Sequence, residues 1–133
     1  MTNLNSKIGF VFVLYKTPLS EIKRLEKEVK NLKIIDYRLY FIDNSESGQG
    51  FAAGANLGIK KAIDDGCDLF VIANPDISLV KLFKLDILDA FDRFDIFGYA
   101  MKQQKKVYYG GSIDKWRMSG GLIEKKPSKR FIE

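Results

Sequence analysis

The segment IGFVFVL, residues 8–14, is the stretch that decides the fold. It is apolar without interruption, and its side chains are mostly β-branched or aromatic. A run of this kind suits a strand buried on both faces, which is the environment that a parallel sheet provides. The segments YRLYFI at 37–42 and LFVIA at 69–73 have the same character. We therefore predict three strands of a mainly parallel sheet.

Helical patterns separate these strands. Thr17 and Pro18 are typical of a helix start, with a hydroxyl cap followed by proline, and apolar residues then recur at helical spacing over 22–32. A second helix is expected at about 51–65, with an apolar stripe of Ala52, Ala55, Ile59, Ala62 and Ile63 and an end at Gly66. The third helix is expected at about 78–91 and a fourth strand at 95–101.

Alternating strands and helices predict right-handed crossovers and helices on both faces of the sheet. We therefore expect one α/β domain of Rossmann-like type over residues 1–133, with its core at about 7–101. Residues 102–133 are expected to be loop-rich, with a turn and short strand near 103–109, a glycine-rich loop to 121 and a ragged end.

Composition narrows the possible chemistry. Apolar residues make up 46% and charged residues 29% of the 133 positions, a balance typical of globular domains. There is no histidine, which excludes Ser-His-Asp and Cys-His catalysis and the usual nitrogen ligands of zinc. The single cysteine, Cys67, excludes an internal disulfide and is expected to be a small buried side chain before a strand. The sequence shows neither a signal peptide nor a membrane-spanning run, so we expect a cytoplasmic protein, free or peripheral at the inner membrane face.

The net charge of +5 is concentrated near the C-terminus. Residues 102–133 carry nine Lys or Arg against Asp114, Glu124 and Glu133, whereas the first 101 residues have a net charge of −1. This basic segment either binds diphosphates, anionic lipids or a partner, or is a solvated tail. No base-stacking motif or recognition helix accompanies the charge, so we expect no binding of nucleic acid.

Polar residues follow each of the three strands, at 15–17, 43–45 and 74–76. Because ligands of parallel sheets bind outside the carboxyl ends of the strands, these segments form the candidate site. Asp43 can accept hydrogen bonds from a base or a ribose, or it can cap its own turn. Asn74 and Asp76 can provide oxygen ligands to Mg²⁺ or Mn²⁺, or they can form a simple turn around Pro75.

The segment FAAGANLG, residues 51–58, places Gly54 and Gly58 one helical turn apart. Each costs about 1 kcal/mol relative to alanine inside a helix. Either this face packs closely on the sheet, or it leaves room for a ligand. Asn56 lies off the apolar stripe, where it can reach the same edge as Asp43. The segment is neither a dinucleotide-binding fingerprint nor a P-loop.

Together, segments 13–17, 41–45, 50–59 and 73–76 resemble the inverting family 2 glycosyltransferases with the GT-A fold, particularly the rhamnosyltransferase-like members that build bacterial surface polysaccharides. The resemblance covers about residues 7–101. It implies a donor site for a nucleoside-diphosphate sugar (UDP-, dTDP- or GDP-linked), a divalent cation, and transfer to a saccharide or a lipid-linked acceptor.

The resemblance also assigns roles to residues. Asp43 would contact the base, beside Asn44 in the matching segment, and Asn56 would stand near the nucleotide. Tyr15 and Thr17 would lie at the rim of the same pocket. Asn74-Pro75-Asp76 would replace the metal-binding Asp-x-Asp motif, with the carboxylate of Asp76 reaching the cation and Asn74 in the first position.

Two features depart from the family pattern. Its members are about twice as long, and their general base is an aspartate in an acidic motif of the later half. The carboxylates after residue 101, at 114, 124 and 133, stand in no such motif. We therefore interpret the chain as a truncated donor domain. Segment 110–117 resembles the loop that begins the acceptor side, where Trp116 and Arg117 either contact ligand or mark a packed domain junction.

Three other functions are compatible with the predicted sheet. As a binding module, the chain would hold a nucleotide sugar, or nothing, without catalysis. A phospho-acceptor regulatory domain would use Asp43, but it would also need acidic residues after the first strand. A nucleotidyltransferase would need a glycine- and lysine-rich loop there. Residues 15–17 provide neither.

Overall fold

The computed structural model describes residues 3–114, 116–117 and 119–126. The chain divides into two compact units, Met1–Arg93 and Phe94–Glu133. The first unit contains the predicted sheet and all three strand-end segments, so the candidate site belongs to this unit alone.

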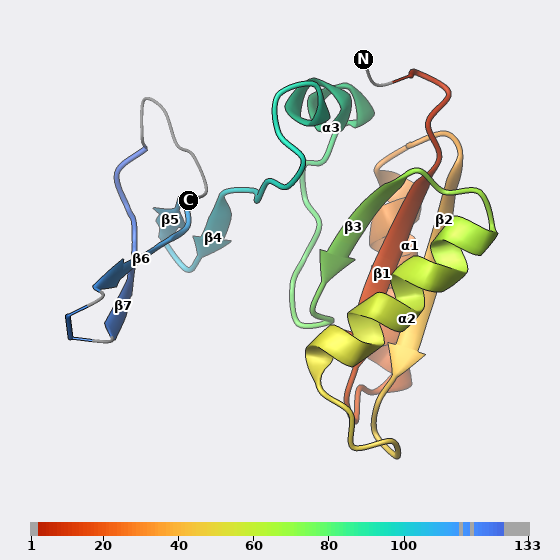
Figure 1. The fold of residues 1–133 in the computed structure, drawn as a ribbon, viewed down its shortest axis with the longest axis horizontal. Coiled ribbons are helices and arrows are strands. Elements are labelled where there is room, and N and C mark those ends of the chain that lie inside the picture. Colours follow the sequence, from red (N-terminus) through yellow and green to blue (C-terminus); the bar gives the residue numbers. More distant parts are fainter. Residues whose placement is uncertain (1–2, 115, 118, 127–133) are drawn as a thin grey trace. The chain divides into compact units, whose positions relative to one another are not determined.

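A three-stranded parallel sheet forms the centre of the first unit (Figure 1). Its strands are β1 (Ile8–Leu14), β2 (Tyr37–Asp43) and β3 (Leu69–Ala73), in the order β2-β1-β3. Every residue of β1 is buried, as expected for a central strand with neighbours on both sides. The prediction of three parallel strands is confirmed.

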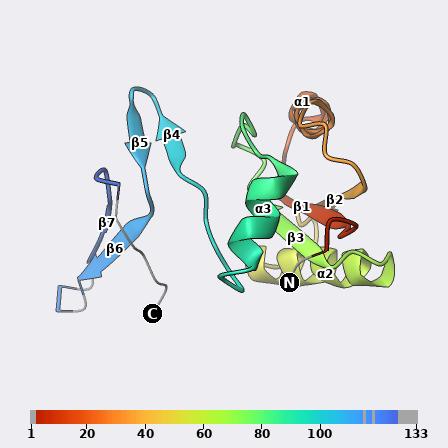
Figure 2. The ribbon, with the colours of Figure 1, turned by 90° about the horizontal axis from the view of Figure 1, so that it is seen from above.

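Helices cover both faces of this sheet, as the sequence predicts. Figure 2 shows α1 (Leu19–Asn31) on one side of the strands and α2 (Phe51–Asp64) on the other. Successive side chains of β1 point to opposite faces, so fully buried Phe10 and Phe12 lie on the face away from α2. The first unit is therefore an α/β sandwich.

Helix α2 packs on the sheet through its glycines. A Cβ atom added at Gly58 would lie 2.3 Å from Cγ1 of Val11, and one at Gly54 would lie 2.6 Å from Cγ1 of Val13. Of the two explanations for these glycines, close packing on the sheet is therefore correct. The predicted apolar stripe is partly wrong, because Ile63 is exposed and the buried face consists of Gly54, Ala55, Gly58 and Ala62.

The turn that follows α2 agrees with the sequence. Gly66 has a φ of +79°, a left-handed conformation that glycine adopts readily after a helix. Cys67 follows it and is buried, as predicted.

After β3, the third predicted helix is confirmed only over residues 84–91, and the predicted fourth strand is wrong. Helix α3 spans only Lys84–Phe91, not 78–91, because residues 77–79 are hydrogen-bonded to side chains of α1. The predicted fourth strand at 95–101 does not join the sheet, and residues 95–100 have no regular secondary structure. Strand β3 is therefore an edge of the sheet in the described part of the chain.

The second unit consists of two small antiparallel pairs. Strand β4 (Met101–Gln103) pairs with β5 (Lys106–Tyr108), and β6 (Gly111–Asp114) pairs with β7 (Ser119–Leu122). The turn and short strand near 103–109 are confirmed. The predicted glycine-rich loop at 110–121 is wrong because β6 and β7 form a ladder there, which backbone hydrogen bonds between 109–110 and Ile123 extend.

Trp116 is 98% exposed. Four charged residues of the basic segment, Lys115, Lys129, Arg130 and Glu133, lie outside the described residues, as does the end predicted to be ragged. In the part of the chain that the structure covers, no helix has the length and apolar character needed to cross a bilayer.

Candidate functional site

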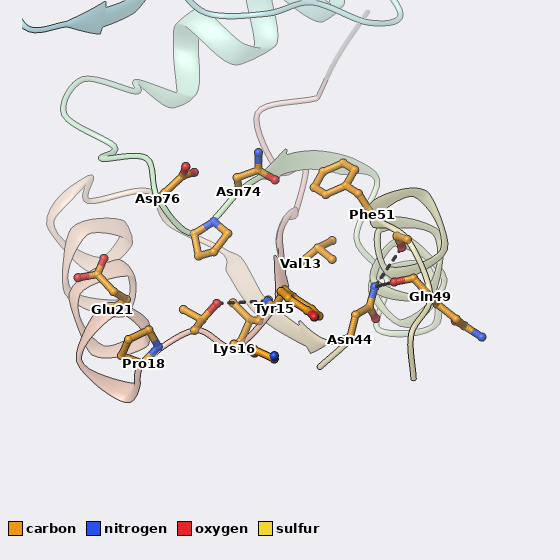
Figure 3. Close-up of a pocket in the computed structure, with 14 residues that line it drawn as sticks. Val13, Tyr15, Lys16, Pro18, Glu21, Asn44, Gln49, Phe51, Asn74 and Asp76 are labelled. Carbon is orange, nitrogen blue, oxygen red and sulfur yellow. Dashed lines mark hydrogen bonds between the residues drawn. The ribbon is translucent and has the colours of Figure 1, made fainter. Parts of the chain in front are cut away.

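A cavity of about 650 Å³ lies at the carboxyl edge of the sheet (Figure 3). This volume is within the range of small-molecule sites, about 300–1,000 Å³. The ends of all three strands, the start of α1 and the start of α2 contribute its lining, at residues 13–18, Glu21, Asn44, 49–51 and 74–76. The predicted convergence of strand ends on one edge is therefore confirmed.

Five of the seven predicted site residues line this cavity, namely Tyr15, Thr17, Asn44, Asn74 and Asp76. The structure does not bring the other two, Asp43 and Asn56, to it. Asn56 is exposed on α2. It is two residues from both Gly54 and Gly58, about 200° around the helix from each, so it points away from the sheet.

Asp43 completes the turn after β2. Its carboxylate accepts hydrogen bonds from the backbone N–H of Ser45, at 2.9 Å, and from the Ser45 hydroxyl. The hydroxyl, and after it the N–H, lowers the pKa of this exposed carboxyl. The Ser45 oxygen in turn accepts a hydrogen bond from the backbone N–H of Lys16 at 2.7 Å. Asp43 therefore acts on the cavity indirectly, by holding the turn that supports residues 15–17.

The segment after β1 forms one wall of the cavity. Lys16 has a φ of +49°, which is uncommon outside glycine and turns the chain sharply. The hydroxyl of Thr17 accepts a hydrogen bond from the backbone N–H of Tyr15 at 3.3 Å. The sequence predicts that Thr17 caps α1, and this prediction is wrong. The N-cap of α1 is Pro18, which makes no side-chain hydrogen bond. The ring of Tyr15 is 64% exposed, with the Lys16 ammonium 5.4 Å from its centroid.

Asn44 shapes the opposite wall. Its side chain is buried, and its amide donates to the carbonyl oxygens of Gln49 and Gly50, at 3.1 and 3.0 Å (Figure 3). These bonds fix the loop that leads into α2, so that Phe51 lies at the cavity with about half of its surface exposed. Sequence reasoning missed residues 49–51, although a glycine directly before a helix at the carboxyl edge is a usable signal.

The third wall holds the oxygen donors. Asn74 and Asp76 are exposed and project from the segment after β3, and Glu21 of α1 lies on the same side of the cavity (Figure 3). Among the described residues, no group of three or more Asp, Glu, Cys or His side chains is arranged to hold a metal ion. One or two carboxylates and an amide nevertheless suit Mg²⁺ or Mn²⁺ when phosphate oxygens supply further ligands. The donor set fits a cation shared with a diphosphate.

The cavity thus offers two exposed aromatic rings, one lysine, and a carboxylate–amide pair. The backbone N–H groups in the first turn of α2 add to this set. The N-cap residue of this helix is Gly50, so no side chain caps these groups. Comparisons with protein-family models, with curated proteins and with solved structures found no match to this chain. The functional conclusion therefore depends on the cavity and on the motifs that line it.

Proposed function

We propose that the first unit is the donor-binding domain of a family 2 glycosyltransferase of the GT-A type. It binds a nucleoside-diphosphate sugar together with Mg²⁺ or Mn²⁺, for inverting transfer to a saccharide or lipid-linked acceptor. One observation carries this proposal. The four segments that resemble the family, 13–17, 41–45, 50–59 and 73–76, all contribute residues to a single cavity of suitable size.

Each wall of the cavity suits one part of such a donor. Tyr15 and Phe51 present aromatic faces to a planar base. Lys16 and the free N–H groups in the first turn of α2 suit the diphosphate, because a helix N-terminus attracts anions. Asp76 and Asn74 would hold the cation, which neutralises the charge that develops on the departing diphosphate.

The same cavity supports donor binding better than complete catalysis. Its lining includes two carboxylates, Glu21 and Asp76. Glu21 is paired with Arg24 at 2.8 Å, and Asp76 is assigned to the cation. Neither is free to deprotonate an acceptor hydroxyl. A nucleotide-sugar-binding module without transfer activity is therefore the second candidate function.

Thermal shift measurements test the proposal directly. The full chain is heated with UDP, dTDP or GDP, each with Mn²⁺ or with EDTA. At a ligand concentration of 100 times Kd, binding stabilises the folded state by about 2.7 kcal/mol. At least one nucleotide should stabilise the chain, and more strongly with Mn²⁺. No response to any of the three would overturn the donor site.

Two variants locate the cation. Asp76→Ala should abolish the Mn²⁺-dependent part of the shift, because it removes the only carboxylate that the proposal assigns to the metal. Asp86→Ala is the matched control, since Asp86 is an exposed carboxylate of α3 outside the cavity. An unchanged Mn²⁺ effect in Asp76→Ala would contradict the metal assignment. Stabilisation by beryllofluoride instead of nucleotides would favour a phospho-acceptor domain.

A further inference from the structure

One side chain of α1, that of Arg24, makes hydrogen bonds to the backbone of the segment that carries Asp76. Arg24 donates from Nη2 to the carbonyl oxygen of Pro75 at 2.8 Å and from Nη1 to that of Ile77 at 3.0 Å. These carbonyl groups belong to the residues directly before and directly after Asp76. The same guanidinium lies 3.3 Å from the hydroxyl of Ser78. One planar group therefore fixes the backbone before and after the predicted metal ligand.

Two carboxylates of the same helix hold Arg24 in this position. Its Nε donates to Glu21 at 2.8 Å, and its Nη1 donates to Glu28 at 2.8 Å. The second oxygen of Glu28 accepts the backbone N–H of Leu79 at 2.9 Å. We call Glu21, Arg24 and Glu28 the α1 clamp. Its members retain 42%, 29% and 22% of their side-chain exposure, so solvent screens them only in part.

The charges of Arg24 and Glu28 are stable at neutral pH. The hydrogen bond to Glu28 raises the pKa of Arg24 despite partial burial, so the guanidinium stays charged. Partial burial raises the pKa of Glu28, but the hydrogen bonds from Leu79 and Arg24 and the charge of Arg24 together lower it below its ordinary value. Arg24 and Glu28 are therefore both charged in the range where a nucleotide diphosphate would bind.

The chemistry of the clamp requires arginine. Residues 77–79 belong to neither a helix nor a strand, so their backbone groups depend on side chains for hydrogen bonds. A guanidinium has five N–H donors in a rigid plane and can serve two carbonyls and two carboxylates together. A lysine ammonium has three donors at one point, which cannot bridge the carbonyls on both sides of Asp76 in the same way.

We propose that Arg24 is a positioning residue for Asp76, which it aligns for the cation and the diphosphate. This inference rests on the proposed donor site. Glu21 lines the same cavity and binds Arg24, so the clamp connects two points of one wall, Glu21 and the backbone of Asp76. Residues that orient a metal ligand typically change metal affinity by about 10- to 100-fold when they are replaced.

The test compares Arg24→Ala, Arg24→Lys and Lys27→Ala in the full chain. Lys27 lies exposed on the same helix, so its variant removes one positive charge without touching the clamp. Calorimetry measures the Kd of the best-binding nucleoside diphosphate with Mn²⁺ and with EDTA. In Arg24→Ala the improvement in affinity that Mn²⁺ provides should fall about tenfold, while the affinity in EDTA stays the same. Arg24→Lys should show most of this loss, and Lys27→Ala none.

Hydrogen exchange provides the second measurement, independent of any ligand. The amide of Leu79 should exchange faster in Arg24→Ala than in the wild type or in Lys27→Ala, because Glu28 loses the partner that orients it. If Arg24→Ala folds poorly, the loss of the Mn²⁺-dependent gain in affinity is measured in Arg24→Lys instead, because this variant keeps the positive charge of the clamp.

The outcomes separate the two proposals. An unaltered Mn²⁺ effect in Arg24→Ala, in a chain that binds nucleotide, overturns the positioning role and leaves the donor site intact. An equal loss of affinity with Mn²⁺ and with EDTA also overturns it, because the arginine is then merely structural. A wild-type chain that binds no nucleotide overturns the donor site, and the positioning role with it.

Discussion

Replacing Gly58 with alanine tests how closely α2 packs on the sheet. The added Cβ would lie 2.3 Å from Cγ1 of Val11 and 3.2 Å from Cγ1 of Ile42. Carbon atoms in contact prefer a separation of about 3.5–4.0 Å, so the first distance is too short by more than about 1 Å. Val11 is fully buried and branched at Cβ, so its methyl group cannot move aside as a long flexible side chain could.

Two opposing terms set the expected change in stability. Alanine gains about 1 kcal/mol over glycine in helix propensity. Overpacking a core costs about 1–3 kcal/mol, and the short distance to Val11 places Gly58→Ala near the upper end of that range. The free energy of unfolding should therefore fall by about 2 kcal/mol. Comparing Lys60→Ala with Lys60→Gly calibrates the propensity term on exposed α2 surface, because both lose the same ion pair to Asp64.

A double-mutant cycle isolates the contact. Unfolding of the full chain in urea gives the free energy for Gly58→Ala, Val11→Ala and the double variant. Val11→Ala alone leaves a cavity and destabilises the fold. In the double variant the new methyl group occupies that space, so the two changes should couple favourably by about 1–3 kcal/mol. Additive effects, within about 0.5 kcal/mol, would refute the packing argument.

Three further predictions concern the cavity and the clamp. Asp43→Ala should weaken nucleotide binding in calorimetry because Ser45 loses its acceptor, whereas Asp43→Asn keeps a carbonyl acceptor and should bind like the wild type; equal losses would mean that the carboxylate itself contacts the ligand. Phe51→Ala should weaken nucleotide binding about fivefold through lost stacking, with Leu57→Ala, exposed on the same helix, as the unaffected control. Folding lowers the pKa of Glu28 below its ordinary value of 4.5, so the ionised carboxylate stabilises the fold at pH values above 4.5. This stabilisation is lost as the pH falls through the lowered pKa. The difference in unfolding free energy between wild type and Glu28→Gln should therefore shrink from about pH 6 to about pH 3, and a constant difference would contradict it.

The sheet and its functional edge could be predicted because both follow from short-range patterns. An uninterrupted apolar run such as 8–14 has few places in a small domain other than the centre of a parallel sheet. Once three strands are parallel, chain direction alone brings 15–17, Asn44 and 74–76 to one edge. No knowledge of side-chain contacts is needed for that conclusion.

The roles of individual residues depend on contacts that local sequence does not contain. The rotation of α2 about its axis places glycines against β1, and a stripe defined by apolar side chains cannot detect them. This rotation directs Asn56 away from the cavity. The sequence correctly predicts Asp43 at a strand end, yet its bonds to Ser45 keep it in its own turn.

The error at the start of α3 has a similar cause. Residues 78–83 contain enough leucine and phenylalanine to suggest a helix. Local helix propensity is weaker there than the hydrogen bonds that Arg24 and Glu28 make to residues 77–79, which hold this segment against α1. About fifty residues separate Arg24 from the carbonyl groups of Pro75 and Ile77 that it binds, so its role becomes visible only in the folded chain.

The charges around the cavity give an independent reason to expect a cation. The lysine and the acidic residues of its lining are Lys16, Glu21 and Asp76. Glu21 shares the charge of Arg24 with Glu28, so Lys16 is the positive charge that the lining offers to the ligand, opposite Asp76. A nucleoside diphosphate brings at least two negative charges, so the protein alone cannot balance them. A divalent cation bound at Asp76, as proposed, would restore neutrality and would convert a repulsive carboxylate into an anchor for the diphosphate. Nucleotide binding by this cavity should therefore depend far more on the metal than on any single side chain that faces the base.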